Sequence, residues 1–215
     1  DYIGSRGLGD VYKRQEMKQD VWVKEEEVPN PKLEKASDVI VKIGAAGVCR
    51  TDLHVIEGEW RHIQDPDDKL LPCVMGHENA GWIEEVGSDV EGFKKGDSVI
   101  LHPIISGTNG TCLSCRKGLD THAENGIFPG LNVKEGGYSE LLKTSVRNLI
   151  KIPNTLTPKD VAPFSDAGLT AYRVAKKATR HLLPGENCVV IGAGGLGHIC
   201  LLYTSDAADE YSRVV

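Results

Sequence analysis

The sequence predicts a mostly β module joined to the beginning of an α/β unit, and two observations lead to this fold class. Between residues 21 and 153, short runs rich in β-branched side chains alternate with glycine-containing turns, which is typical of an all-β module. After residue 157, a helix-start signal is followed by an apolar run that meets the glycines of GAGGLG at 192–197. That order is typical of the first strand and helix of an α/β unit.

The strands of the β module are expected in five places. Residues 21–28 alternate weakly and run into the turn PNP, and the β-branched run DVIVKIG at 38–44 predicts a strong strand. A strand is expected at 80–87, which ends at a glycine turn, and FKKGDSVIL at 93–101 has the turn-then-strand form of a small barrel. The strand pattern returns between 136 and 153.

The segments between these strands are expected to be short helices or loops. Residues 53–60 favour a short helix, and the polar stretch 61–69 favours a surface loop. The stretch 103–137 is rich in Gly and Asn and predicts an irregular lobe.

A long helical region should follow the β module. TPKD at 157–160 has a capping hydroxyl, a proline at the first position and an acid at the third, which together indicate a helix start. The helix should restart at Pro163 and end before PG at 184–185. Basic side chains suit the negative end of its dipole: Lys176, Lys177 and Arg180.

The glycine motif at 192–197 follows the buried-strand pattern NCVVIG and precedes a helix expected near Gly195. In this context the motif predicts a dinucleotide site. Gly192 would permit the tight turn, Gly194 would let the backbone approach a pyrophosphate, and Gly197 would let the helix pack on the strand. The alternative is an ordinary glycine-rich βα turn.

Two motifs in the β module indicate a metal site. Cys49 lies in GVCRTDLH at 47–54, and His77 lies in GHE at 76–78. Thiolate and imidazole are ligands that Zn²⁺ prefers, and a catalytic zinc needs three protein ligands and an open position. Asp166 is the candidate third ligand, although it could be only a helix-capping acid. Cys49 could likewise be a core residue.

Composition excludes several classes of protein. Hydrophobic content of 40% and charged content of 26% are ordinary for a globular protein, and a net charge of -6 gives no electrostatic footprint for nucleic acid or acidic membranes. No run approaches membrane-spanning length and no signal peptide opens the chain, so a cytoplasmic location is expected. The six cysteines suggest metal ligands and core residues rather than disulfides, with Cys73 and Cys188 in the core.

Taken in order and spacing, GVCxTDxH, GHE, DAGLTAY at 166–172 and GAGGLG resemble the zinc-dependent medium-chain alcohol dehydrogenases of the prokaryotic type, from about Val21 to Ile199. The resemblance implies a GroES-like catalytic domain over 16–165 and the first βα unit of a Rossmann domain over 166–199. It implies hydride transfer between an alcohol and NAD or NADP, with an aldehyde or ketone as product, in a homo-oligomeric parent. A polyol or sugar dehydrogenase of the same superfamily, or an inactive metal-binding fragment, is the alternative.

The resemblance also implies a role for each site residue. Cys49, His77 and Asp166 would hold the zinc. Thr51 would hydrogen-bond the alcohol oxygen and start a proton relay through the nicotinamide ribose to His54. Asp52 would orient His77, and Glu78 would be a nearby conditional ligand. Trp60 would line the alcohol pocket, unless it is a core residue. The residues that would contact the cofactor are Arg50, Thr170, Gly192, Gly194, Gly195, Leu196 and Gly197.

A second zinc site is not expected in the lobe. The family resembled holds a structural zinc on four ligands spaced CxxCxxCx7C, and here only Cys112 and Cys115 remain, since the outer positions are Asn109 and Ala123. Two thiolates are not enough for a tetrahedral structural zinc. The other possibility is that His102 or His122 completes the set.

Both ends of the chain are expected to be non-native. DVYKRQ at 10–15 can be encoded by GATGTGTATAAGAGACAG, and the reverse complement of these bases, read from its second base, encodes CLLYTS at 200–205. Residues 1–15 and 200–215 therefore resemble translated arms of a sequencing-library adaptor and are excluded from fold reasoning. The alternative is a natural tail.

Overall fold

The computed structural model describes residues 23–59, 61–67, 69–107, 110–182, 186 and 188–205. The chain forms two compact units, the first ending at Ala162 and the second beginning at Pro163. None of the helices in the described part of the chain is long and apolar enough to cross a membrane.

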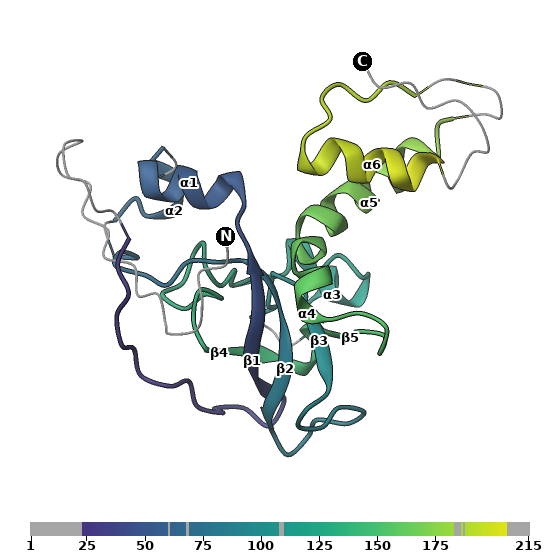
Figure 1. Cartoon of the computed structure of the whole chain (residues 1–215). Coiled ribbons are helices and arrows are strands. Elements are labelled where there is room, and N and C mark those ends of the chain that lie inside the picture. Colours follow the sequence, from purple (N-terminus) through teal and green to yellow (C-terminus); the bar gives the residue numbers. More distant parts are fainter. Residues whose placement is uncertain are drawn as a thin grey trace. The chain divides into compact units, whose positions relative to one another are not determined.

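The first unit is built on one antiparallel sheet with the strand order β4-β1-β2-β3-β5 (Figure 1). Its strands are β1 (Asp38–Gly47), β2 (Glu78–Val86), β3 (Ser98–Leu101), β4 (Leu141–Ser145) and β5 (Leu149–Lys151). These ranges confirm the strands expected at 38–44, 80–87, 93–101 and 136–153, and the mostly β character of this part of the chain.

One stretch that was expected to be a strand is not one. Residues 23–28 form no strand, so this prediction is wrong for the described part of 21–28. Glu25, Glu26 and Glu27 are consecutive and exposed, so the middle of the stretch lacks the alternating apolar side chains that a half-buried strand needs.

The main core lies against the sheet and is made of aliphatic side chains that the strands bury. These are Val39, Val41, Ile83, Val99, Leu101, Leu142 and Leu149. The β-branched run of β1 supplies Val39 and Val41, both fully buried, and central β2 supplies Ile83. Burial of such side chains stabilises a fold by about 1.5–3 kcal/mol each.

The helix after β1 begins earlier than expected. α1 spans Arg50–Glu57 rather than 53–60, because the Asp52 carboxylate accepts the backbone N–H of Cys49 at 2.8 Å and so caps the first turn. The helix ends at Gly58, which takes the left-handed conformation with φ of 68°.

The polar stretch 61–69 is not simply a surface loop, and that prediction is wrong in part. α2 spans Arg61–Gln64, and the Asp65 side chain that follows is buried. Its carboxylate accepts the backbone N–H groups of Lys69 and Leu70 at 2.6 and 2.9 Å, and that of Leu71 at 3.3 Å. A charged residue can be buried here because its oxygens are satisfied by backbone donors.

The irregular lobe contains only short helices, α3 (Leu113–Arg116) and η1 (Asp120–His122), and η2 (Val146–Asn148) lies between β4 and β5. At the end of the first unit, α4 (Pro158–Val161) begins as expected. Thr157 and Asp160 form the capping box, with the Thr157 N–H and hydroxyl donating to the Asp160 carboxylate at 2.7 and 2.6 Å.

In the second unit, α5 spans Ala167–Ala178 and α6 spans Gly195–Ser205, and η3 (Ala162–Ser165) precedes them. The start of α6 at Gly195 confirms the expected helix. The strand expected at 187–192 does not appear among the described residues of this unit, although Val190 forms an isolated β-bridge.

Candidate metal centre

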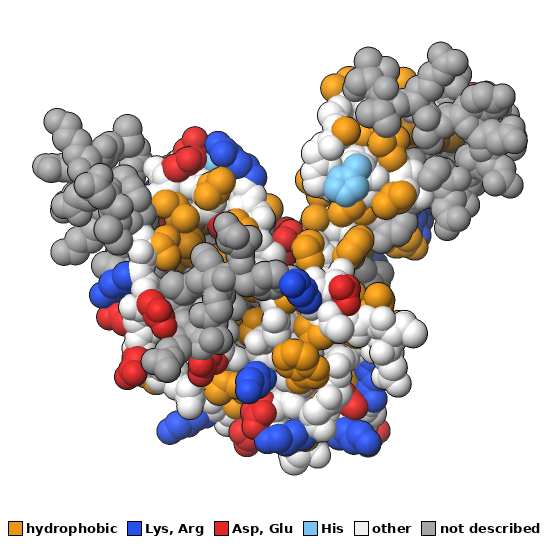
Figure 2. Space-filling view, viewed as in Figure 1, with side chains coloured by type: hydrophobic (Ala, Val, Ile, Leu, Met, Phe, Trp, Pro, Cys, Tyr) orange, Lys and Arg blue, Asp and Glu red, His pale blue; other side chains and the backbone are white. Residues whose placement is uncertain are grey.

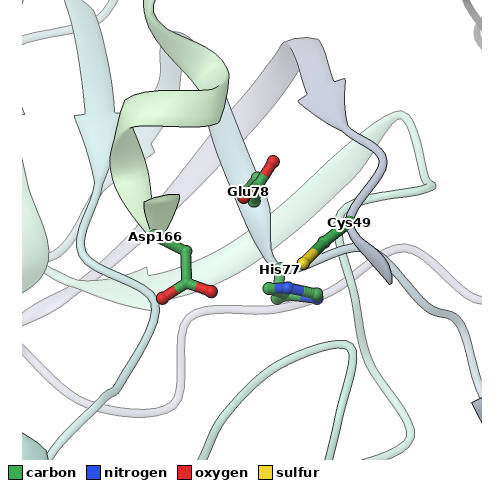
Figure 3. Close-up of side chains that lie close together, drawn as sticks. All are labelled: Cys49, His77, Glu78 and Asp166. Atoms are coloured by element: carbon green, nitrogen blue, oxygen red, sulfur yellow. The ribbon is translucent and has the colours of Figure 1, made fainter. Parts of the chain in front are cut away.

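The centre lies at one end of the β1–β2 pair. Gly47, the last residue of β1, pairs with Glu78, the first residue of β2, so the residues just outside each strand lie beside each other. Cys49 is two residues beyond β1 and His77 immediately precedes β2. Ligand atoms of Cys49, His77 and Glu78 lie within 4.8 Å of one another (Figure 3). The strand pairing therefore brings together residues that are 28 positions apart in sequence.

Burial differs among these three side chains. His77 and Glu78 are buried, and Cys49 is half-buried at the start of α1. Gly47 makes room for Glu78, because a Cβ at Gly47 would lie 2.2 Å from the Glu78 Oε2 atom. A thiol, an imidazole and a carboxylate in one buried position are a donor set suited to a transition metal.

Asp52 lies behind His77 and connects it to Cys49. Its Oδ1 atom is 3.2 Å from His77 Nδ1, and its Oδ2 atom accepts the Cys49 N–H. The His77 ring also packs edge-on against Phe128, with ring centroids 5.6 Å apart. A carboxylate on one ring nitrogen fixes the orientation of a histidine and presents its other nitrogen to a metal. The geometry thus suits the role predicted for Asp52.

Tyr138 belongs to the same network, and the sequence did not single it out. Its hydroxyl donates to Asp52 Oδ2 at 2.9 Å and lies 3.1 Å from the Gly47 carbonyl. Burial and the neighbouring Asp52 charge raise the pKa of Tyr138 far above its ordinary value, so the phenol stays a donor. The signal in the sequence was the pair of glycines before it and Gly76, whose absent side chain leaves room for the Tyr138 ring.

Asp166 immediately precedes α5 in the second unit, and it is the fourth side chain labelled in Figure 3. It occupies the N-cap position of the helix, but its side chain makes no capping hydrogen bond. Thr170 donates its backbone N–H to the Asp166 carbonyl at 2.8 Å, which places the two residues one turn apart, and the Thr170 side chain is exposed.

The residues expected to move a proton lie on α1. Thr51 is half-buried in the first turn, and His54 follows one turn later with 21% of its side chain exposed. His54 Nδ1 contacts the Glu59 carboxylate and lies 4.0 Å from Glu57, and these three residues form a second group of possible metal ligands. Arg50 is exposed at the helix start and lies 3.8 Å from Glu57.

The glycine turn has the backbone expected of it. Gly192 has a positive φ of 93°, which favours glycine, and a Cβ at Gly197 would lie 1.9 Å from the Gly192 carbonyl oxygen. A Cβ at Gly194 or Gly195 would meet no atom within 4 Å, and Leu196 is half-exposed. This part of the backbone is therefore open to a ligand.

Other sequence-predicted residues lie elsewhere. Trp60 and Asn109 are outside the described residues. Cys73 is buried as predicted, whereas Cys188 is only half-buried because the strand predicted around it does not form. Cys112 and Cys115 belong to neither of the two groups of metal-ligand side chains found among the described residues. His102 Nδ1 contacts backbone atoms of Ile104.

Comparison with known proteins identifies the family. Residues 35–154, which include the sheet and the side chains of Cys49, His77 and Glu78, match the family described as the alcohol dehydrogenase GroES-like domain. The chain is 41% identical over 165 residues to an NAD-dependent alcohol dehydrogenase of Sulfolobus acidocaldarius, covering 76% of this chain and 46% of that protein. It is 39% identical over 172 residues to a D-arabinose 1-dehydrogenase (NADP(+)) of Saccharolobus solfataricus, and this match covers 79% of this chain and 46% of that protein.

A solved structure agrees with these relatives. The crystal structure of the alcohol dehydrogenase from Aeropyrum pernix superimposes with a TM-score of 0.81 at 44% identity, covering 94% of this chain and 56% of that one. The chain spans about half the length of the curated relatives it matches. The matched domain makes up more than half of the chain, and the chain belongs to the medium-chain alcohol dehydrogenase family.

Proposed function

We propose that Cys49, His77 and Asp166 hold one catalytic zinc ion, and that the complete protein transfers hydride between a primary or secondary alcohol and NAD or NADP. The observation that carries this proposal is the convergence of Cys49, His77 and Glu78, whose ligand atoms lie within 4.8 Å of one another. Membership in the alcohol dehydrogenase family supports the reaction class.

The donor set fits zinc better than a hard cation. Mg²⁺ and Ca²⁺ prefer oxygen ligands, whereas a thiolate with an imidazole suits Zn²⁺. Asp52, 3.2 Å from His77 Nδ1, supplies the outer carboxylate that usually orients a ligand histidine. Both features come from residues of the first unit alone.

The proposed third ligand, Asp166, follows shortly after a residue that is buried in the first unit. Ala162, the last residue of the first unit, is buried and packs against Ala45 and Ala80. These two are strand partners two residues from the Gly47–Glu78 pair. Asp166 is four residues further on, and four residues span at most about 14 Å. So short a connection is compatible with Asp166 as the third ligand, the role that the family pattern gives it.

Glu78 would be a neighbour of the metal rather than a permanent ligand. A catalytic zinc has three protein ligands and keeps one position for substrate. With Cys49, His77 and Asp166 in place, a fourth protein ligand would close that position. The buried Glu78 carboxylate would instead bind only when the open position is empty, as a conditional ligand.

Bound zinc supplies the acidity that the reaction needs, since it lowers the pKa of coordinated water by about 9 units. Residues of the chain would transfer the proton that the alcohol loses. Thr51, on the first turn of α1, would hydrogen-bond the alcohol oxygen and accept its proton while passing its own toward His54. His54 suits the outer end of the relay because its side chain is partly exposed to solvent, which can take up the proton.

The glycine turn would bind the cofactor. The open backbone at Gly194 and Gly195 and the helix start of α6 suit a pyrophosphate, because helix N-termini present backbone N–H groups to anions. Gly192 and Gly197 shape the turn. The remaining cofactor contacts are carried over from the family pattern: Arg50 to the pyrophosphate, and Thr170 and Leu196 to the nicotinamide.

A sugar or polyol dehydrogenase is the second candidate, because one relative is named a D-arabinose 1-dehydrogenase that uses NADP. The metal centre is the same in both cases. The two candidates differ in the substrate pocket, where Trp60 is the proposed wall. Assays of a longer form of the protein with simple alcohols and with pentoses would separate them by the ratio of kcat/KM.

The metal proposal is tested by the zinc content of the chain and of Cys49→Ala and Asp166→Ala variants, measured by elemental analysis. We expect about one zinc per chain, lost or strongly reduced in both variants. Cys73→Ala and Asp89→Ala are matched controls, since Cys73 is a buried cysteine of the core and Asp89 an exposed acid on a turn. Zinc that stays in both ligand variants would contradict the proposed centre.

Hydride transfer is a separate question for this chain, because it spans half the length of its relatives. NADH formation with ethanol would support an active enzyme as it stands. A chain that binds zinc but neither NAD nor NADP would be the metal-binding part of the enzyme alone.

A further inference from the structure

Cys112 and Cys115 form a buried pair of thiols away from the metal centre. Cys112 immediately precedes α3 and Cys115 lies in its first turn, so the two side chains lie on the same side of the chain. The Cys112 thiol donates to the Cys115 sulfur, and the sulfur atoms are 3.1 Å apart. Both side chains are buried, with 8% of Cys112 and 2% of Cys115 exposed.

The surroundings hold the pair in place. The Cys115 thiol donates to the Ser106 hydroxyl at 3.2 Å, and the Arg147 guanidinium donates to the Cys115 carbonyl at 2.9 Å. Arg147 is itself fixed by Asp120, at 2.7 and 3.2 Å. The Ser106 contact lowers the pKa of the Cys115 thiol, but Cys112 and burial together raise it above its ordinary value.

We propose that Cys112 and Cys115 are a peroxide-sensitive dithiol, which hydrogen peroxide converts to an intramolecular disulfide and which a thiol reductant restores. The separation of 3.1 Å supports this, because the sulfurs must approach only to about 2.05 Å and the side chains already point at each other. Burial favours a small oxidant over a bulky one.

The chemistry balances with peroxide as the oxidant. Cys112, the more exposed thiol, attacks one peroxide oxygen as its thiolate, and the O–O bond breaks to give a sulfenic acid and water. The Cys115 sulfur then attacks the Cys112 sulfur and displaces its oxygen as a second water. Two electrons leave the two sulfurs, both thiol protons end in water, and one S–S bond forms.

Disulfide formation would change the lobe around it. The Cys115 thiol proton is lost, and with it the hydrogen bond to Ser106. Ser106 lies beside Ile105, which bridges to Ile127 and so closes the lobe. In the oxidised form, the disulfide would therefore fix the first turn of α3. The hydrogen bond that joins this helix to the loop at Ser106 would be lost.

The pair can be followed in one peptide. Trypsin releases residues 96–116, which contain Cys112 and Cys115 and no other cysteine, whereas residues 70–94 contain only Cys73. The folded chain would be treated with peroxide and then alkylated at its remaining thiols under denaturing conditions. The tryptic peptides would be analysed by mass spectrometry. We expect the 96–116 peptide to lose the mass of two hydrogens and to resist alkylation. The disulfide in this peptide should form about tenfold faster than peroxide modifies Cys73. Dithiothreitol should restore both alkylation sites.

Single variants give the control. In Cys115→Ser the disulfide cannot form, so a sulfenic acid at Cys112 should persist and be trapped by dimedone, which should not label the unmodified chain. Peptide 96–116 that keeps both thiols while Cys73 reacts would overturn the proposal, and so would irreversible sulfinic acid at Cys112. Zinc that is lost on Cys112→Ser would also overturn it, since the pair would then be a metal site.

Discussion

Asp52 links several residues of the candidate centre. Its carboxylate contacts His77, accepts the Cys49 N–H and accepts the Tyr138 hydroxyl, and its side chain is buried. One side chain therefore positions both proposed zinc ligands of the first unit and starts α1. A buried carboxylate is tolerated because each of its contacts is a polar partner.

Tyr138→Phe removes one hydroxyl from this network and keeps the ring that packs on Gly76. We expect the affinity for zinc to fall by about tenfold, because outer partners of metal ligands contribute about 10- to 100-fold. Competition with a chromophoric chelator measures this. Tyr172→Phe is the control, because Tyr172 is half-exposed on α5, and its affinity should stay unchanged. Equal affinity in the unmodified chain and Tyr138→Phe would mean that Tyr138 only packs.

Asp65 makes a similar contribution to folding. Asp65→Asn weakens three contacts to backbone N–H groups, and hydrogen bonds to a charged group contribute about 1.5–3 kcal/mol each. We expect the free energy of unfolding at pH 7 to fall by about 2 kcal/mol in urea titrations. Asp67→Asn, two residues away on the surface, should change it by less than about 0.5 kcal/mol.

The effect of Asp65→Asn should also depend on pH. Burial of the carboxyl would raise the pKa of Asp65, but the backbone N–H groups of Leu70, Lys69 and Leu71 and the charge of Arg61 lower it below its ordinary value. A lowered folded pKa stabilises the fold above the unfolded value of about 3.9 and loses that effect as the pH falls through the folded pKa. The difference between Asp65→Asn and the unmodified chain should therefore shrink below about pH 4. A difference that is constant with pH would contradict the assigned contacts.

The sheet depends on the strand at its centre. β2 has neighbours on both sides, and Ile83 on this strand is buried, whereas Ile150 on the edge strand β5 is 62% exposed. Truncation of a buried isoleucine to alanine costs about 2–5 kcal/mol, and an exposed one costs much less. Ile83→Ala should therefore lower the unfolding midpoint in urea far more than Ile150→Ala. Similar midpoints would show that the core is not where the structure places it.

The second unit exposes several large apolar side chains among its described residues. In the second unit Val189, Ile191, Leu196 and Leu202 are each at least half-exposed, and hydrophobic side chains lie at its surface in Figure 2. Contiguous exposed apolar surface promotes association. We expect concentration-dependent self-association in sedimentation velocity and binding of the dye ANS.

A double variant tests the cause of that association. Val189→Lys with Ile191→Lys should reduce both signals, because it places two charges on the apolar surface. Leu113→Lys is the control, since Leu113 is about as exposed as Val189 but lies on the lobe of the first unit. Association that is unaffected by the double variant would place the contact elsewhere.

Local pattern was enough for much of the fold. The β-branched run at 38–44 and the capping residues Thr157 and Asp160 carry their signals within a few neighbouring positions, and both predictions are confirmed. The strands expected at 21–28 and 187–192 do not appear among the described residues. A strand needs a buried face and a partner strand, and both depend on the rest of the fold.

The sequence by itself determined the family and the residue types of the metal centre, because motif spacing preserves the chemistry that a ligand set needs. Only the tertiary structure decided which groups support that centre. Tyr138 reaches Asp52 across 86 residues, and Asp65 is buried because a loop folds its backbone N–H groups onto it. Such contacts depend on how distant segments pack, and no local periodicity records them.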